Sequence, residues 1–294
     1  MSGRPRIGVT VGDPAGIGPE IARKAAADAR LASTCEIVLY GPHADAETAR
    51  FALGRISAEA GRAAYDALVQ AVDDAKAGRI DALATAPINK EAFAAAGLPW
   101  RGHTELLAHL TGAPRAAMMF YSEALRVILA TVHIPLADVS GALTRPLLEE
   151  IIGLAARELP RFGIVSPRLA LAGLNPHAGE HGLMGGEEEA VLAPAVAACR
   201  ARGIDIQGPL PADTVFVRAV RGEFDAVVAC YHDQGLIPVK LLAFGKAVNV
   251  TLGLPIIRTS VDHGTAFDIA GRGAADPASL IEAIRLAARL AVKA

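Results

Sequence analysis

The 294-residue chain is poor in cysteine, in aromatic residues and in net charge. Its three cysteines, Cys35, Cys199 and Cys230, are scattered without CxxC spacing and are expected to be small buried apolar residues. So small and odd a number argues against a disulfide framework and indicates a reducing compartment. The net charge is −2, aromatic residues make up 4% of the chain, and no basic stripe is present. Nucleic acid is therefore not an expected partner.

Long apolar segments are also absent from the sequence. No apolar run approaches the roughly 20 residues that a membrane-spanning helix needs. The first residues lead into a β-type run and a glycine loop, without the pattern of a signal peptide. We therefore expect a cytoplasmic protein that does not associate with a membrane.

Short β-type runs alternate with longer helical patterns along almost the whole chain, which is typical of an α/β protein with a mostly parallel sheet. The predicted strands are Ile7–Val11, Glu36–Tyr40, Asp81–Thr85, Ala116–Phe120, Val127–Thr131, Leu169–Gly173, Ala226–Ala229 and Val248–Val250. The predicted helices are one that starts near Ile17 and those at Ala58–Ala77, Asn89–Ala96, Arg145–Leu159, Glu187–Arg202 and Pro277–Val292. The length favours two domains, and because no linker separates them the chain is expected to cross between them more than once.

Three histidines follow predicted strands in polar, glycine-rich contexts: His133 in ATVHIPL, His177 in GLNPHAGE and His232 in YHDQG. Open α/β sheets bind their ligands at the carboxyl ends of the strands. Three imidazoles at that edge suit a divalent metal, with help from the nearby carboxylates of Asp138, Glu180 and Asp233. The alternative is that these histidines only form structural hydrogen bonds.

The segment GDPAGIGPE, residues 12–20, joins the first predicted strand to the first predicted helix. Glycines allow a tight turn there, and a helix N-terminus presents free N–H groups to an anion. The spacing matches neither the GxGxxG nucleotide fingerprint nor a P-loop, so an ordinary strand–helix turn is the alternative. A second helix start, GHTE, offers Thr104 as a helix cap and His103 as a donor to phosphate.

Three polar residues, Lys240, Asn249 and Arg258, lie among apolar neighbours. A charge in such surroundings needs a partner, and converging Lys and Arg side chains suit phosphate or carboxylate. Internal salt bridges are the alternative. The following segment, residues 260–273, is rich in glycine and small polar residues, which is typical of a nucleotide-binding loop or of a long surface loop.

Eight sequence blocks, in order, resemble the 4-hydroxythreonine-4-phosphate dehydrogenase family of vitamin B6 biosynthesis: GDPAGIGPE, TAPINKEAF, GHTELLA, ATVHIPL, GLNPHAGE, LPADTVF, YHDQGLIPVK and VNVTLGLPIIRTSVDHGTAFDIAG. The resemblance implies the two-domain fold of isocitrate and isopropylmalate dehydrogenases. On this basis residues 1–105 and 265–294 form a first α/β domain, and residues 106–264 form a second that carries a homodimer interface. The implied reaction is the oxidation of the secondary alcohol of 4-phosphohydroxy-L-threonine to a β-keto acid that decarboxylates. It depends on NAD and on a divalent metal, which is zinc, magnesium, cobalt, nickel or manganese.

The resemblance also assigns roles to individual residues. The implied metal ligands are His133 and His177 of one subunit and His232 of the partner subunit. The implied substrate-binding residues are His103, Thr104, Lys240, Asn249 and Arg258, and the candidates for the catalytic base are Lys240 and Asp213. The implied NAD-binding loop contains His263, Gly264, Thr265, Ala266 and Asp268.

One segment departs from the family pattern, because the connection between Tyr40 and Ala58 is shorter than is typical. It lies outside the eight blocks, so we expect a trimmed peripheral element that leaves the active site in place but affects the choice of substrate. Related dehydrogenases oxidise 4-phosphothreonate, 4-phosphoerythronate or aromatic cis-dihydrodiols, and these substrates are alternatives. More remote alternatives are a metal-dependent hydrolase or lyase, which needs no nucleotide loop, and a noncatalytic metal- or phosphate-binding regulator.

Overall fold

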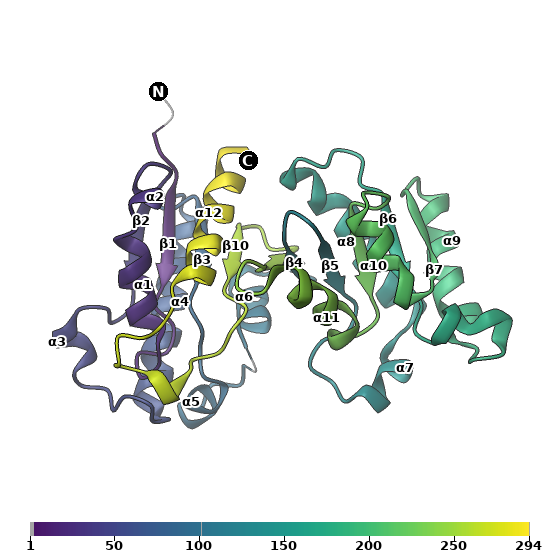
Figure 1. The fold of residues 1–294 in the computed structure, drawn as a ribbon. Helices are drawn as coiled ribbons and strands as arrows, with labels where there is room; N and C mark the ends of the chain where they lie inside the picture. Colours follow the sequence, from purple (N-terminus) through teal and green to yellow (C-terminus); the bar gives the residue numbers. More distant parts are fainter. Residues whose placement is uncertain (1–2, 101, 294) are drawn as a thin grey trace. The chain divides into compact units, whose positions relative to one another are not determined.

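The computed structural model describes residues 3–100 and 102–293 (Figure 1). Its contacts divide the chain into two compact units, one containing the residues up to Ala116 and those from Val248 onward, the other Ala117–Ala247. The chain crosses between the units twice, after Ala116 and after Ala247. The boundaries differ from the expected 105 and 265, because strands formed after residue 247 belong to the sheet of the first unit.

The first unit is built on strands in the order β2-β1-β3-β10-β9. Neighbouring strands are parallel except for β9, which is antiparallel to β10. The strands are β1 (Arg6–Thr10), β2 (Glu36–Tyr40), β3 (Ala82–Thr85), β9 (Val248–Leu252) and β10 (Arg258–Ser260). Pairing between strands aligns one residue of each in a single row: Tyr40, Thr10, Thr85, Ser260 and Asn249. Because paired residues share a face of the sheet, polar side chains from every strand of this sheet lie on the same face.

Helices cover this sheet and bury an apolar core. They are α1 (Gly18–Ala26), α2 (Ala29–Ala32), α3 (Asp45–Thr48), α4 (Ala58–Lys76), α5 (Lys90–Ala95), α6 (His103–Thr111), the 3₁₀ turn η5 (Phe267–Ile269) and α12 (Ala278–Lys293). On α4, Ala64, Leu68 and Val72 are buried on one face, as their spacing predicts. No helix in the described ranges is long and apolar enough to cross a membrane.

The second unit contains strands in the order β4-β5-β8-β6-β7. The strands are β4 (Ala117–Tyr121), β5 (Arg126–Leu129), β6 (Leu169–Ala172), β7 (Ile206–Leu210) and β8 (Ala226–Ala229). β4 and β5 form an antiparallel pair, and the other neighbours are parallel. The helical segments are η1 (Leu136–Asp138), α7 (Val139–Ala142), α8 (Arg145–Glu158), η2 (Leu159–Phe162), η3 (Pro176–Gly182), the π-helix η4 (Glu188–Leu192), α9 (Ala193–Ala201), α10 (Ala212–Val220) and α11 (His232–Ala243).

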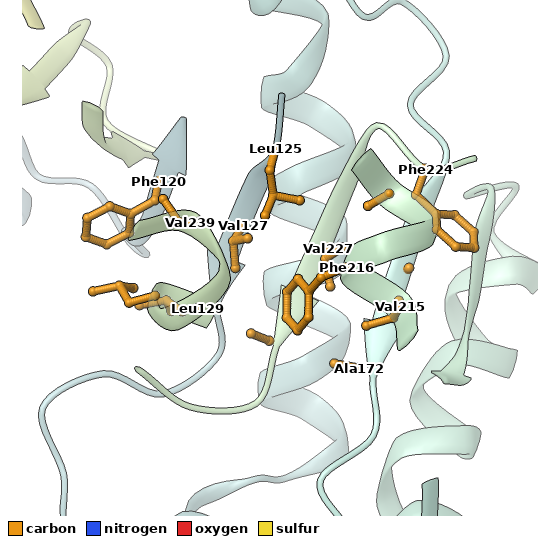
Figure 2. Close-up of a cluster of buried hydrophobic side chains, with 14 of the residues drawn as sticks. Phe120, Leu125, Val127, Leu129, Ala172, Val215, Phe216, Phe224, Val227 and Val239 are labelled. Atoms are coloured by element: carbon orange, nitrogen blue, oxygen red, sulfur yellow. The ribbon is translucent and has the colours of Figure 1, made fainter. Parts of the chain in front are cut away.

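Helix α11 packs closely on the sheet of the second unit, and a glycine makes this possible. A Cβ atom at Gly235 would lie only 2.7 Å from side-chain atoms of Val127 and Leu129 on β5. Figure 2 shows Val127 and Leu129 with Val239 of α11 in the buried apolar cluster. The glycine of the YHDQG motif therefore positions the helix that begins with His232.

The sequence predicts the edges of its eight strands to within two residues, but it misses β7 and β10. β7 contains glycine and proline (IQGPL) and β10 has only three residues, so neither has a recognisable strand pattern. Helices α10 and α11 were also missed. The predicted helix Glu187–Arg202 begins as the π-helix η4, where the carboxylate of Glu188 accepts hydrogen bonds from Asn175 instead of facing solvent.

Candidate active site

The three histidines predicted to bind a metal follow three adjacent strands of the second unit. β5, β8 and β6 are neighbouring parallel strands, so their carboxyl ends share one edge of the sheet. His133 follows β5, His232 follows β8 and His177 follows β6. The prediction that all three lie beyond strand carboxyl ends is confirmed.

The side chains of these histidines have the chemistry of metal ligands. The ring centroids of His133 and His232 lie 5.6 Å apart. Nδ1 of His232 lies 2.6 Å from a carboxylate oxygen of Asp233, and Nδ1 of His177 lies 3.6 Å from one of Glu180. At His232 the carboxylate that holds Nδ1–H leaves Nε2 as the lone-pair donor, an arrangement typical of metal-binding histidines, whereas the separation at His177 is too long for a hydrogen bond. Among the described residues, no three His, Cys, Asp or Glu side chains form a cluster that could hold a metal.

His177 lies in a strained turn. Residues 177–181 all have positive φ angles, between 43 and 79°. This left-handed conformation costs a non-glycine residue about 1–2 kcal/mol, so neighbouring contacts must stabilise it. Glu188, which is 3% exposed, accepts hydrogen bonds from the backbone N–H and the Nδ2 of Asn175 at 2.7 and 2.9 Å. Glu187 accepts one from the same Nδ2 at 2.8 Å and another from the Ser140 hydroxyl at 2.7 Å. These two carboxylates fix the residue from which the turn starts.

Arg258 is the central residue of a polar cluster in the first unit. Its side chain is 2% exposed and donates from Nη1 to the Thr251 hydroxyl at 2.8 Å and from Nη2 to the Thr85 hydroxyl at 2.7 Å. Its Nε is buried without a hydrogen-bond partner, and no carboxylate in the described part of the chain forms an ion pair with it. Burial lowers the pKa of Arg258 to about 9, so the guanidinium is protonated at neutral pH. The interior of this unit thus contains a positive charge without a counter-charge.

Two further predicted substrate residues have buried polar atoms without partners. These atoms are Nε2 of His103, in the first turn of α6, and Oδ1 of Asn249 on β9. Burial, together with the positive charge of Arg258, lowers the pKa of His103 well below its ordinary value, so the imidazole is neutral at pH 7. Buried polar groups are almost always hydrogen-bonded. The unpartnered nitrogens of Arg258 and His103, one a donor and the other able to donate as Nε2–H, therefore mark a site for an anion with several oxygen atoms, whereas Oδ1 of Asn249 can accept only from a donor group of the ligand.

The predicted NAD loop lies against the GDPAGIGPE loop. The N–H of Ile17 donates to the carbonyl of Thr265 at 3.0 Å, and a Cβ atom at Gly16 would lie 2.8 Å from the same oxygen. Lys24 on α1 donates to the carbonyls of Gly273 and Ala275 at 2.9 and 2.8 Å. Glycine at position 16 is therefore required by the close approach of the two loops, and α1 also holds the segment that follows the predicted NAD loop.

Within that loop, one histidine has an unpartnered nitrogen. Nδ1 of His263 lies 2.9 Å from the carbonyl of Gly264, whereas its Nε2 is buried without a partner. Ala266 has a φ of 42°, and Gly264 and Asp268 are exposed.

The shortened connection between Tyr40 and Ala58 is in contact with both loops, which corrects the expectation that it is peripheral. Gly54 donates from its N–H to the carbonyl of Ala15 at 2.8 Å, and a Cβ atom there would lie 2.8 Å from the carbonyl oxygen of Phe267. Phe51 packs in a small buried cluster with Ala15, against which Phe267 also lies. This connection therefore supports the loops at the carboxyl end of β1.

Other predicted site residues lie elsewhere. Lys240 on α11 and Asp213 in the first turn of α10 are both exposed and belong to the second unit. Thr104 lies in the first turn of α6, but the N-cap residue is Gly102, so Thr104 does not cap this helix.

The sequence did not indicate four further polar groups of these clusters: the hydroxyl groups of Thr85, Thr251 and Ser260 and the carboxylate of Glu188. Small polar residues in otherwise apolar strands, as in ALAT and VNVTL, were the only available signal.

Comparison with known proteins gives a consistent result. Residues 18–287 match the family model described as pyridoxal phosphate biosynthetic protein PdxA. The chain is 48% identical to a 4-hydroxythreonine-4-phosphate dehydrogenase of Beijerinckia indica, over 97% of this chain and 95% of the relative. It is 46% identical to a D-threonate 4-phosphate dehydrogenase of Cupriavidus necator, over 98% of each. The match to the Beijerinckia protein extends over 320 residues, more than the 294 of this chain, so that relative carries residues that are absent here.

Solved structures agree with this result. A 4-hydroxythreonine-4-phosphate dehydrogenase of Klebsiella pneumoniae has a TM-score of 0.90 and 44% identity, covering 98% of this chain and 99% of its own. A terephthalate 1,2-cis-dihydrodiol dehydrogenase of Burkholderia xenovorans has a TM-score of 0.69 and 33% identity, with 98% of both chains covered. The isocitrate dehydrogenase of Methylococcus capsulatus has a TM-score of 0.53 at 18% identity, covering 94% of this chain and 82% of its own, which confirms the expected fold.

Proposed function

The chain belongs to the family of the pyridoxal phosphate biosynthetic protein PdxA, and on this premise we propose that it oxidises 4-phosphohydroxy-L-threonine with NAD and a divalent metal. The secondary alcohol loses a hydride to NAD and a proton to a base, which gives NADH and a β-keto acid. The β-keto acid then loses carbon dioxide. The observation that carries the proposal is the buried charge of Arg258, whose hydrogen-bond partners within residues 3–100 and 102–293 are hydroxyl groups only.

The phosphate of the substrate is assigned to the polar cluster of the first unit. A phosphate dianion compensates the charge of Arg258 and accepts hydrogen bonds from its Nε. The neutral ring of His103 supplies one N–H to the phosphate, and Asn249 supplies Nδ2–H to the phosphate or Oδ1 to a hydroxyl of the substrate. These contacts hold a part of the substrate that does not react, and the binding energy serves to orient the alcohol.

The metal is assigned to His133 and His177 with His232 of the partner subunit. The hydrogen bond from Asp233 orients the imidazole of His232, Glu180 lies 3.6 Å from Nδ1 of His177, and histidine nitrogen suits zinc, nickel and cobalt. When bound, a divalent metal lowers the pKa of the substrate alcohol and stabilises negative charge on its oxygen. Lys240, about two helical turns after His232 on α11, and Asp213 on α10 are the candidates that accept the alcohol proton.

A homodimer is supported by the apolar side chains that flank the histidines. Leu136, which begins η1 shortly after His133, is 69% exposed. Leu183, which follows the turn of His177, is 80% exposed. On α11, Ile237 and Leu241 are one turn apart and both exposed. Exposed apolar residues that gather near a site are typical of an interface.

NAD is assigned to the loop from His263 to Asp268. The hydrogen bond from Ile17 to Thr265 supports the backbone of this loop, which reduces the entropy lost when a nucleotide binds. The unpartnered Nε2 of His263 accepts a hydrogen bond from the nucleotide.

The decisive experiment measures NADH formation by protein stripped of metal with a chelator and supplied with 4-phosphohydroxy-L-threonine. We expect no NADH before a divalent metal is added back and steady formation afterwards. Activity without metal would contradict the three-histidine site. A lack of activity with every metal would contradict the substrate assignment.

A second substrate, D-threonate 4-phosphate, has almost equal support, since relatives with that activity are nearly as similar to this chain. The same assay with this substrate distinguishes the two. A higher kcat/KM for D-threonate 4-phosphate would retain the phosphate and metal sites and change only the substrate.

A further inference from the structure

A chain of hydroxyl groups surrounds the guanidinium of Arg258. The Thr85 hydroxyl accepts from Nη2 at 2.7 Å and donates to the Ser260 oxygen at 3.0 Å. The Ser260 hydroxyl in turn donates to the Thr85 carbonyl at 3.2 Å. Each hydroxyl proton is thus directed away from the guanidinium, so that Thr85 presents a lone pair to Nη2.

These contacts fix the plane of the guanidinium without neutralising it. Thr85 and Thr251 hold its two terminal nitrogens at 2.7 and 2.8 Å, and both are buried, so solvent does not compete. A carboxylate in either position would satisfy the same nitrogens but would also cancel the charge that attracts an anion. Neutral acceptors orient Arg258 and leave its charge available.

We propose that Thr85, supported by Ser260, is a positioning residue that orients Arg258 toward the phosphate of the substrate. The inference rests on the proposed phosphate site and extends it to a residue that acts only through Arg258. Thr85 and Ser260 are paired neighbours on β3 and β10, so the sheet itself sets their distance.

The test compares Thr85→Val, which keeps the shape of the side chain, with Thr85→Ser, which keeps the hydroxyl. The dissociation constant for inorganic phosphate is measured by calorimetry on the full chain, together with KM and kcat for the phosphorylated substrate. Loss of a hydrogen bond to a charged group corresponds to an about 10- to 100-fold change in affinity. We expect Thr85→Val to weaken phosphate binding and raise KM by that factor with little change in kcat. Thr85→Ser is expected to keep the phosphate affinity and the KM of the unsubstituted protein.

Thr259→Val is the matched control. Thr259 is also buried on β10, but it lies on the opposite face of the sheet and donates to the carbonyl of Ala283 at 2.9 Å. Its replacement removes a buried hydrogen bond without touching Arg258, so we expect lower stability and unchanged phosphate affinity.

The outcomes separate the inference from the proposed function. If Arg258→Met abolishes phosphate binding but Thr85→Val binds phosphate as well as the unchanged protein or better, the positioning role is wrong and the phosphate site stands. If Arg258→Met binds phosphate normally, the phosphate site itself is wrong. Should Thr85→Val fail to fold, Ser260→Ala takes its place, since it removes the acceptor that orients the Thr85 hydroxyl, and unchanged phosphate affinity in that variant would overturn the inference.

Discussion

Arg258 holds a positive charge in the interior of the first unit with two threonine hydroxyls as its partners. A buried charge without a counter-charge is destabilising, because hydroxyl groups replace only part of the lost hydration. A protein keeps such a destabilising charge where the charge serves to bind a ligand. The charge of Arg258 therefore raises the affinity for an anion and lowers the stability of the protein without ligand.

This conflict predicts the behaviour of Arg258→Met. Methionine fills much of the same space without a charge, so the free energy of unfolding without ligand is expected to rise. Binding of inorganic phosphate, and the stabilisation that phosphate gives to the unchanged protein, are expected to disappear. Thermal denaturation with and without phosphate measures both effects. Lower stability of the variant without phosphate would show that the hydroxyls fully compensate the charge.

His103 predicts a dependence of stability on pH. Its pKa is lowered in the folded protein, whereas the unfolded chain has the ordinary value near 6.5. Below that pH the unfolded state binds a proton that the folded state does not, so stability is fully present above pH 6.5 and is lost as the pH falls toward the folded pKa. The slope is at most about 1.4 kcal/mol per pH unit.

Urea denaturation of the unchanged protein and of His103→Gln between pH 7.5 and 5.5, without phosphate, measures this contribution. The unchanged protein is expected to lose more stability than the variant over this range. His109→Gln, at an exposed position of the same helix, is the control and should behave as the unchanged protein does. Parallel curves for all three proteins would contradict the lowered pKa of His103.

At the scale of elements, the turn of His177 and the π-helix η4 form one polar assembly. Asn175 precedes the five left-handed residues 177–181 in the chain. Its hydrogen bonds to the carboxylates of Glu187 and Glu188 fix this end of the turn. The irregular first turn of η4 places the buried carboxylate of Glu188 toward Asn175. Irregular π-helical turns are frequent at functional sites, where they aim one side chain.

This assembly predicts a loss of stability in Glu188→Ala. The variant leaves the N–H and the Nδ2 of Asn175 with fewer acceptors, and each buried group without a partner costs about 1–3 kcal/mol. We expect a decrease in the free energy of unfolding of that order, measured by urea denaturation. Glu189→Ala is the control, because Glu189 is exposed on the same helix and should change stability little. Equal effects of the two variants would contradict the structural role of Glu188.

At the scale of the whole molecule, the proposed metal site needs a second copy of the chain. If His177 and His232 of one site come from different subunits, the inactive variants His177→Ala and His232→Ala complement each other in mixed dimers. Random exchange of subunits makes half of the dimers mixed, each with one complete site, so about a quarter of the activity should return. Activity after mixing under conditions of subunit exchange is the measurement.

Which other pairs of inactive variants complement each other depends on the subunit that contributes His133 to each metal site. If it acts with His177 of its own chain, His133→Ala complements His232→Ala. If it acts with His232, whose ring lies 5.6 Å away in the same chain, His133→Ala complements His177→Ala instead. Failure of every pair to complement would contradict a site shared between subunits.

The sequence alone was sufficient for the α/β class, for eight strands to within two residues, and for the three histidines at strand ends. Alternation of apolar runs, helix spacing and motif blocks are local patterns, and each is readable over 5 to 20 neighbouring residues. Arg258, His103 and Asn249 were likewise predicted as substrate residues on the basis of family resemblance.

Only the tertiary structure revealed how these residues are held. Thr85 and Arg258 are 173 positions apart in the sequence, and their hydrogen bond exists because β3 and β10 are neighbours. The left-handed turn at His177 depends on Glu188, which the helical pattern of the sequence assigns to an ordinary helix start. Local patterns specify which segments become strands and helices, whereas the surroundings of a buried charge are set by contacts between segments that the chain brings together only on folding.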